Sequence, residues 1–126
     1  MAICKYCKNK KIFMKLTDLK VCESCHPLVQ MNISNRIRII QESVDIIAGS
    51  NNNQTIENRL TVIQENLGYL LKLLKSGIPF ELNVEEIFDY LLVTQHKLYE
   101  SEYWDDEQFA KNAIVNKALK KKFLSR

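Results

Sequence analysis

The first 26 residues, MAICKYCKNKKIFMKLTDLKVCESCH (residues 1–26), contain every cysteine of the 126-residue chain. The cysteines form two Cys-x2-Cys pairs, which are separated by fourteen residues. Two such pairs can close around one tetrahedral Zn²⁺ at Zn–S distances of about 2.3 Å. We therefore predict one Zn²⁺ site whose ligands are Cys4, Cys7, Cys22 and Cys25.

We expect this metal to be structural. Catalytic zinc sites usually have three protein ligands and keep the fourth position for water, whereas four thiolates leave no position open. A rubredoxin-like iron site takes the same four ligands and is the alternative. His26 could replace one thiolate, but it directly follows Cys25, and we do not expect two adjacent residues to share one ion.

The rest of the chain has the composition of a helical protein, with only two prolines and three glycines. The N-terminal residues lack the apolar segment of a secretory signal, and no run approaches the roughly 18 apolar residues of a membrane span. We therefore expect a cytoplasmic protein. Thiols stay reduced in that compartment, which favours a metal over a disulfide.

Residues between the two cysteine pairs predict a short β-hairpin. Residues 11–16 are largely apolar, Thr17-Asp18 supplies turn residues, and residues 19–21 return the chain to the second pair. Pro27 suits the first position of a helix, so the second pair should lead directly into one. This order is typical of a treble clef, or of a zinc ribbon with a helical extension.

The same segment resembles a small bacterial zinc-ribbon domain of unassigned function, found near the N-termini of diverse cytosolic proteins. The resemblance covers only the first 26 residues. Two glycines that are usual in this family are replaced here, one by Asn9 and one by Leu19. The resemblance implies a zinc-binding fold and no specific activity. The matching segments are Cys4-x2-Cys7, Lys11-Ile12-Phe13, Lys15-x2-Asp18 and Val21-Cys22-x2-Cys25.

Two long a/d seams of apolar residues predict a helical hairpin after this segment. The first helix should begin at Pro27 or restart at Ser34, and Gly49 stands where a C′ glycine belongs. The second should end at Gly77 and Pro79. The seams consist of Ile33, Ile37, Ile40, Val44 and Ile47, then Ile56, Leu60, Ile63, Leu67, Leu70 and Leu74.

Capping residues predict two further helices. Asn83 with Glu86, and Asp105 with Gln108, have the spacing of a capping box. The predicted fold is therefore mainly α. A zinc ribbon or treble clef at residues 1–26 is followed, at residues 27–126, by a helical hairpin and a second helical pair in a four-helix body.

Charge is distributed unevenly, although the net charge is only +3. Both ends of the chain are basic and the middle is acidic. The basic ends are candidate contacts with nucleic acid or an acidic partner, although lysines near a helix C-terminus also suit its dipole. The candidates are Lys8, Lys10, Lys11, Lys117, Lys120, Lys121 and Lys122.

The acidic stretch from Glu100 to Glu107 could be a carboxylate site, a docking patch or the cap of the fourth helix. We favour the cap, because nothing in the sequence indicates a facing carboxylate or a pocket. His96, in the middle of a helix, is expected at the surface or its boundary.

We therefore expect a non-enzymatic, zinc-containing interaction or regulatory protein that binds a partner protein through its helical body. The alternative is a nucleic-acid-binding regulator that uses the basic residues of the zinc module and the C-terminal helix. The coiled-coil-like seams are long enough for self-association, so we also expect a homodimer.

Overall fold

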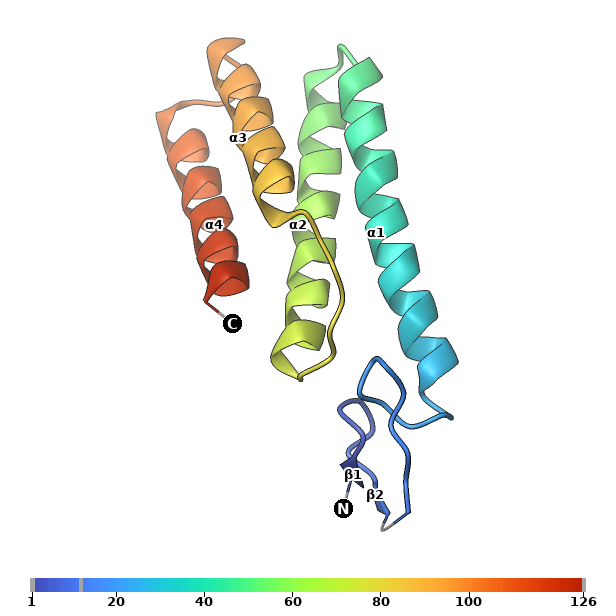
Figure 1. Cartoon of the computed structure of the whole chain (residues 1–126). Helices are drawn as coiled ribbons and strands as arrows, with labels where there is room; N and C mark the ends of the chain where they lie inside the picture. Colours follow the sequence, from blue (N-terminus) through green and yellow to red (C-terminus); the bar gives the residue numbers. More distant parts are fainter. Residues whose placement is uncertain (1, 12, 126) are drawn as a thin grey trace.

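The computed structural model describes residues 2–11 and 13–125 (Figure 1). A short antiparallel pair of strands, β1 (Ala2–Ile3) and β2 (Lys10–Lys11), comes first. The predicted mainly α fold, with four helices after the cysteine-rich segment, is confirmed. The helices are α1 (His26–Gly49), α2 (Asn53–Lys75), α3 (Val84–Glu100) and α4 (Asp106–Leu124).

Helices α1 and α2 form a long hairpin (Figure 1), in which most residues of the predicted seams are buried. From α1, Ile33, Ile40 and Ile47 are buried, and the facing seam of α2 is buried from Ile56 to Leu70. Helix α1 begins at His26, has Pro27 in its first turn and continues through Ser34 without a break. The earlier of the two possible starts is therefore the observed one.

Helices α3 and α4 form a second hairpin, which packs against α2 (Figure 1). The rings of Phe88 in α3 and Phe123 in α4 lie 6.1 Å apart between centroids. The Tyr90 hydroxyl of α3 also donates to the Val44 carbonyl of α1 at 3.2 Å. Helix α2 is thus the central element of the body. Within the described residues, no helix is long and apolar enough to cross a membrane.

The ends of α1 and α2 differ. Gly77, with a φ of +95°, follows α2 in the left-handed conformation. Its amide donates to the Leu74 carbonyl and the Ile78 amide donates to the Leu73 carbonyl, which is a Schellman motif. Gly49 was predicted at the same C′ position, and this is wrong. It is the last residue of α1, and Ser50 leaves the helix in an extended conformation that needs no glycine.

The caps of α3 and α4 lie at the predicted residues. Asp105 and Gln108 form a full capping box, in which each side chain accepts a hydrogen bond from the other residue's amide. Asn83 accepts from the Glu86 amide at 3.3 Å. The carboxylate of Glu86, however, accepts from the Asn83 side chain at 2.7 Å.

The hairpin predicted over residues 11–16 and 19–21 is wrong where the structure describes the chain; Ile12 lies outside the described residues. Strand β1 pairs with β2 instead, with Ala2 opposite Lys11, and brackets the first cysteine pair. Apolar residues of the predicted second strand pack inward: Val21 is fully buried and Leu19 lies against the core. Burial of these side chains, rather than strand pairing, explains the apolar pattern.

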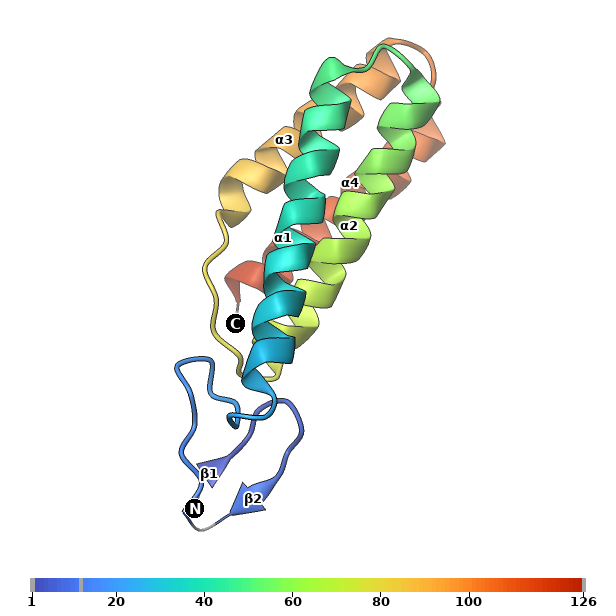
Figure 2. The same cartoon turned by 90° about the vertical axis from the view of Figure 1, so that its right-hand side faces the viewer.

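The cysteine-rich module shares one hydrophobic core with the helices. Cys4 and Val21 belong to the same buried cluster as Val29 of α1, Leu73 of α2 and Ile78. Figure 2 shows the module beneath the start of α1 and the turn after α2. The boundary between residues 26 and 27 as a division between two domains stays a prediction.

Candidate metal centre

The four cysteine sulfurs lie together at the end of the molecule opposite the α1–α2 turn. All four Sγ atoms are within 4.8 Å of one another, and those of Cys7 and Cys22 are 3.9 Å apart. Tetrahedral zinc with Zn–S bonds of about 2.3 Å separates its sulfurs by about 3.8 Å. All four thiols are free. The donor set and its spacing therefore fit a tetrahedral metal ion.

A tight turn positions Cys4 and Cys7. The Cys7 amide donates to the Cys4 sulfur at 3.5 Å, and the Lys8 amide donates to the Cys4 carbonyl at 3.0 Å. Lys8 has a φ of +64°. The left-handed residue therefore immediately follows Cys7, one position before Asn9, where the zinc-ribbon pattern has glycine.

The second pair is continuous with α1. The amides of Cys25 and His26 both donate to the Cys22 carbonyl, at 3.1 and 3.0 Å. Cys25 is the N-cap of α1, but its side chain accepts no capping hydrogen bond. Its sulfur is therefore available to a metal, and a bound ion would lie directly at the start of this helix.

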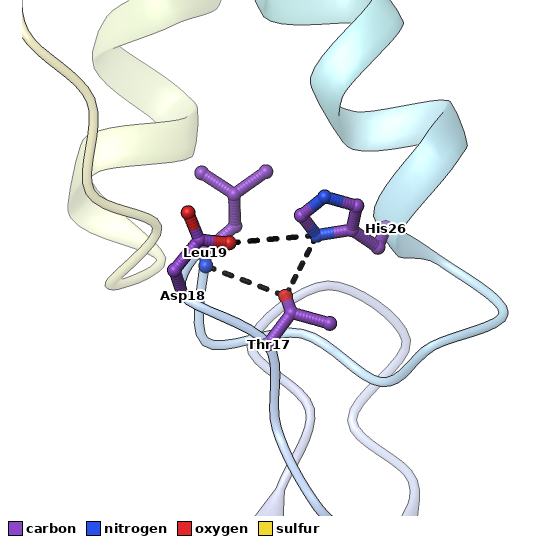
Figure 3. A network of polar contacts seen from close by, with 4 residues as sticks. All are labelled: Thr17, Asp18, Leu19 and His26. Atoms are coloured by element: carbon purple, nitrogen blue, oxygen red, sulfur yellow. Dashed lines mark hydrogen bonds and ion pairs between the residues drawn. The ribbon is translucent and has the colours of Figure 1, made fainter.

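His26 is directed toward the loop before the second pair (Figure 3). Its Nδ1 lies 2.8 Å from the Thr17 hydroxyl and 3.9 Å from an Asp18 carboxylate oxygen. In the part of the chain that the structure describes, the group of potential metal ligands contains the four cysteines and not His26. The contact with Thr17 was not predicted, because no sequence spacing relates a loop hydroxyl to a histidine nine residues later.

The thiols differ in acidity in the metal-free protein. Burial of Cys4 opposes its ionisation, but hydrogen bonds from the amides of Cys22, Cys7 and Tyr6 outweigh it and lower the pKa of Cys4 to about 6. A hydrogen bond with Cys22, together with burial, raises the pKa of Cys25 to about 12. Cys4 is thus available as a thiolate near neutral pH, whereas Cys25 must lose its proton to become a ligand.

The candidate lysines lie on two separate elements. Lys8 and Lys10 are exposed on the module, and Lys117, Lys121 and Lys122 are exposed on α4, where Lys120 is half-buried. The side chain of Lys11 lies outside the described residues. Figures 1 and 2 both show the C-terminal end of α4 directed toward the end of the body that carries the module.

The acidic stretch has structural partners. Asp105 caps α4, and Glu107 forms an exposed ion pair with Lys111 at 3.5 Å. Asp106 accepts a hydrogen bond from the Tyr99 hydroxyl and thereby raises the pKa of Tyr99. The predicted cap is therefore confirmed.

The single histidine of the helical pair also lies where it was expected. His96 is exposed, and its ring centroid lies 4.9 Å from that of Phe109. Its position at the surface is as predicted, and its contact with the Phe109 ring joins α3 to α4.

In comparisons with known proteins, no family model, no curated protein and no solved structure matches the chain. The resemblance to a zinc ribbon therefore depends on the spacing of the cysteines and on their clustering.

Proposed function

We propose that this chain is a non-enzymatic interaction protein in which the cysteine cluster binds one structural Zn²⁺ and the helical body binds a partner protein. Exposed apolar side chains on the outer faces of α3 and α4 carry the proposal. Val93 is 61% exposed and Ile114 is 68% exposed, and Leu92 and Val115 are also exposed. An apolar surface of this kind, outside the core, is typical of protein contacts.

The metal has a structural role in this proposal. The module comprises 26 residues, which is too few to stabilise a fold by burial alone, so metal binding would supply folding free energy. Two observations support this role: Cys25 occupies the N-cap position of α1, and Cys4 is fully buried in the shared core. A bound ion would then fix the start of α1 relative to the turn after α2.

Metal content tests the first half of the proposal. We expect about one zinc per chain in the purified protein, as four thiolates require. Cys4→Ser and Cys22→Ser should each lose it, whereas Ser24→Ala, a change between the ligands of the second pair, should retain it. Elemental analysis also distinguishes zinc from iron. Stoichiometric metal in both cysteine variants would overturn the four-thiolate site.

Partner capture with matched variants tests the second half. Leu92→Glu introduces a charge on the outer face of α3, and Thr61→Glu introduces the same charge on an exposed polar position of α2. We expect a protein bound by the wild-type chain to be lost with Leu92→Glu and retained with Thr61→Glu, with circular dichroism confirming that both are folded. Equal capture by both variants would contradict the proposed surface.

A nucleic-acid-binding function is the second candidate, and one observation favours it. Phe13 is 96% exposed on the module that also carries the exposed Lys8 and Lys10. Aromatic rings beside basic residues suit the stacking of single-stranded bases. Binding to labelled DNA and RNA across a salt series tests it: log affinity should fall linearly with log salt, and Phe13→Ala should weaken binding. Absence of binding at low salt would exclude this candidate.

A further inference from the structure

Helix α4 has apolar residues on two opposite faces. On one face Phe123 is buried in the body, and Phe109 and Leu119 pack against the core. The other presents Ala110, Ile114 and Ala118, which recur every four residues and are all exposed. A helix that is apolar on both sides is normally covered on both sides. The outer face of α4 therefore has the character of a contact surface.

The apolar surface extends from α4 toward α3. A cavity of about 300 Å³ lies between the two helices, and apolar side chains of Phe88, Leu92 and Ala113 line it together with the polar ones of Asp89, Asn116, Lys117 and Lys120. Lys117 also lines this cavity and lies one helical turn after Ile114, so the cavity borders the outer face of α4. Together they offer a surface broader than one row of side chains.

Charges on this face are arranged symmetrically about Ile114. Glu107 lies seven residues before it and Lys121 seven residues after it, and Ala110 and Ala118 lie four residues to either side. Seven residues are close to two helical turns, so both charged side chains lie on nearly the same face as Ile114. The first turn of α4 is acidic and the last turn is basic.

We propose that α4 pairs in antiparallel orientation with α4 of a second copy of this chain, centred on Ile114. The pairing sets Glu107 level with Lys121 of the other copy, twice by symmetry, and sets Ala110 level with Ala118. A parallel pair would set like charges against each other at both ends. This inference rests on the proposed function, because it takes the helical body as a protein-binding surface and names its partner.

The pairing also sets Lys111 level with Lys117 of the other copy. These like charges lie on opposite edges of the contact, so their long side chains can extend into solvent and avoid each other. The seams of α1 and α2, from which self-association was predicted, are buried against each other within one chain. They cannot provide the dimer surface, whereas the outer face of α4 can.

The expected dimer is weak. Helix α4 has 19 residues, which corresponds to a length of about 28 Å. A contact of one helix against one helix is at the low end of specific interface sizes. We therefore expect association that depends on protein concentration and weakens at high salt, because its charged pairs are exposed.

Sedimentation velocity of the full zinc-loaded chain over a concentration series tests the contact. Ile114→Glu should weaken association at least tenfold, because it sets two like charges together at the centre. Met31→Glu is the matched control, because Met31 is an exposed apolar residue of α1, 61% exposed. We expect it to associate like the wild-type chain. Circular dichroism should show the same helix content in both variants.

Charge reversal tests the orientation. Glu107→Lys alone and Lys121→Glu alone should each lose self-association, because every pair then joins like charges. A mixture of the two variants should regain it, because Glu107 of one then meets Lys121 of the other, and the introduced pair is complementary as well. Failure of the mixture to associate when the wild-type chain does would overturn the antiparallel pairing.

The pairing of two copies and the binding of a partner protein can be disproved independently. A wild-type chain that remains monomeric at the highest concentration would overturn the pairing of two copies. So would a dimer that is insensitive to Ile114→Glu. Loss of association in Met31→Glu alone would place the contact on α1 and also overturn it. In each case the partner-capture experiment with Leu92→Glu still decides the proposed function.

Discussion

At the scale of single residues, Gly77 is constrained both by its backbone and by its surroundings. Its φ is +95°, and a Cβ there would lie 3.3 Å from the side chain of Lys5. We expect Gly77→Ala to destabilise the protein by about 1–2 kcal/mol, the usual cost of the left-handed conformation for a residue with a Cβ. Chemical denaturation of the metal-loaded protein measures this change.

Gly68 provides the control for this prediction. It lies inside α2, and a Cβ there would meet no atom within 4 Å. Gly68→Ala should therefore stabilise the protein by up to about 1 kcal/mol, because alanine favours the helix. Equal effects at Gly68 and Gly77 would show that the end of α2 is not the Schellman motif described above.

At Lys20, in contrast to Gly77, we expect a substitution to increase the stability of the protein. It has a φ of +64° in the turn that its amide closes onto the Thr17 carbonyl at 2.9 Å. Lys20→Gly should stabilise the metal-loaded protein by about 1 kcal/mol, because glycine adopts this conformation without steric cost. Lys15→Gly, in the same module but without a positive φ, should destabilise it. Thermal unfolding of both variants distinguishes these outcomes.

The left-handed positions of the cysteine-rich module could not be predicted from the sequence. The resemblance to zinc ribbons placed glycine-type residues at Asn9 and Leu19, whereas the structure has the positive φ values at Lys8 and Lys20. Glycine marks such a site in a sequence, but lysine gives no signal for it. The four ligands, in contrast, were predictable, because their spacing alone brings the pairs together.

At the scale of elements, the capping box of α4 has a measurable contribution. Asp105 accepts from the Gln108 amide at 2.8 Å, and the Gln108 side chain accepts from the Asp105 amide at 3.0 Å. Asp105→Ala removes the first bond and should cost about 1 kcal/mol in the free energy of unfolding. Asp105→Asn keeps an acceptor and should cost only a fraction of this. Identical losses in both would mean that the cap contributes through its charge.

Helices could be predicted where apolar residues recur with a helical period or where capping residues mark the start of a helix. The seam from Ile56 to Leu74 and the cap at Asp105 each led to the observed element. The hairpin between the cysteine pairs was predicted wrongly, because a short apolar segment looks the same whether it pairs as a strand or packs inward as a loop. Val21 packs inward.

At the scale of the whole molecule, the arrangement of the second hairpin could not be predicted. Neighbouring helices joined by a short turn, such as α1 and α2, are expected to pack together. The position of α3 and α4 against α2, with the hydrogen bond from Tyr90 to Val44 reaching α1, depends on side-chain fit. The sequence likewise does not decide which face of α4 packs inward, because the apolar residues of this helix lie on two faces.

Metal removal should loosen one end of the molecule and leave the other folded. The module shares its core with the start of α1 through Cys4, Val21 and Val29, whereas Ile47, near the end of α1, packs beside the α1–α2 turn at the opposite end of the molecule (Figure 1). Without metal, the free energy that zinc contributes to folding is lost from the module. Acidification should act in the same direction, because protons compete with the metal for the thiolates.

Hydrogen exchange with and without a zinc chelator measures this effect along the chain. We expect protection to fall in the first two turns of α1 and to persist in the middle of α2 and in α3. The Cys4→Ser variant is the control: it should resemble the chelated wild-type protein and show no further change when chelator is added. Unchanged protection in α1 after complete metal removal would mean that the hydrophobic contacts of Val21 and Val29 alone hold the module in place. Loss of protection in all four helices would instead mean that the module and the helical body unfold as one cooperative unit.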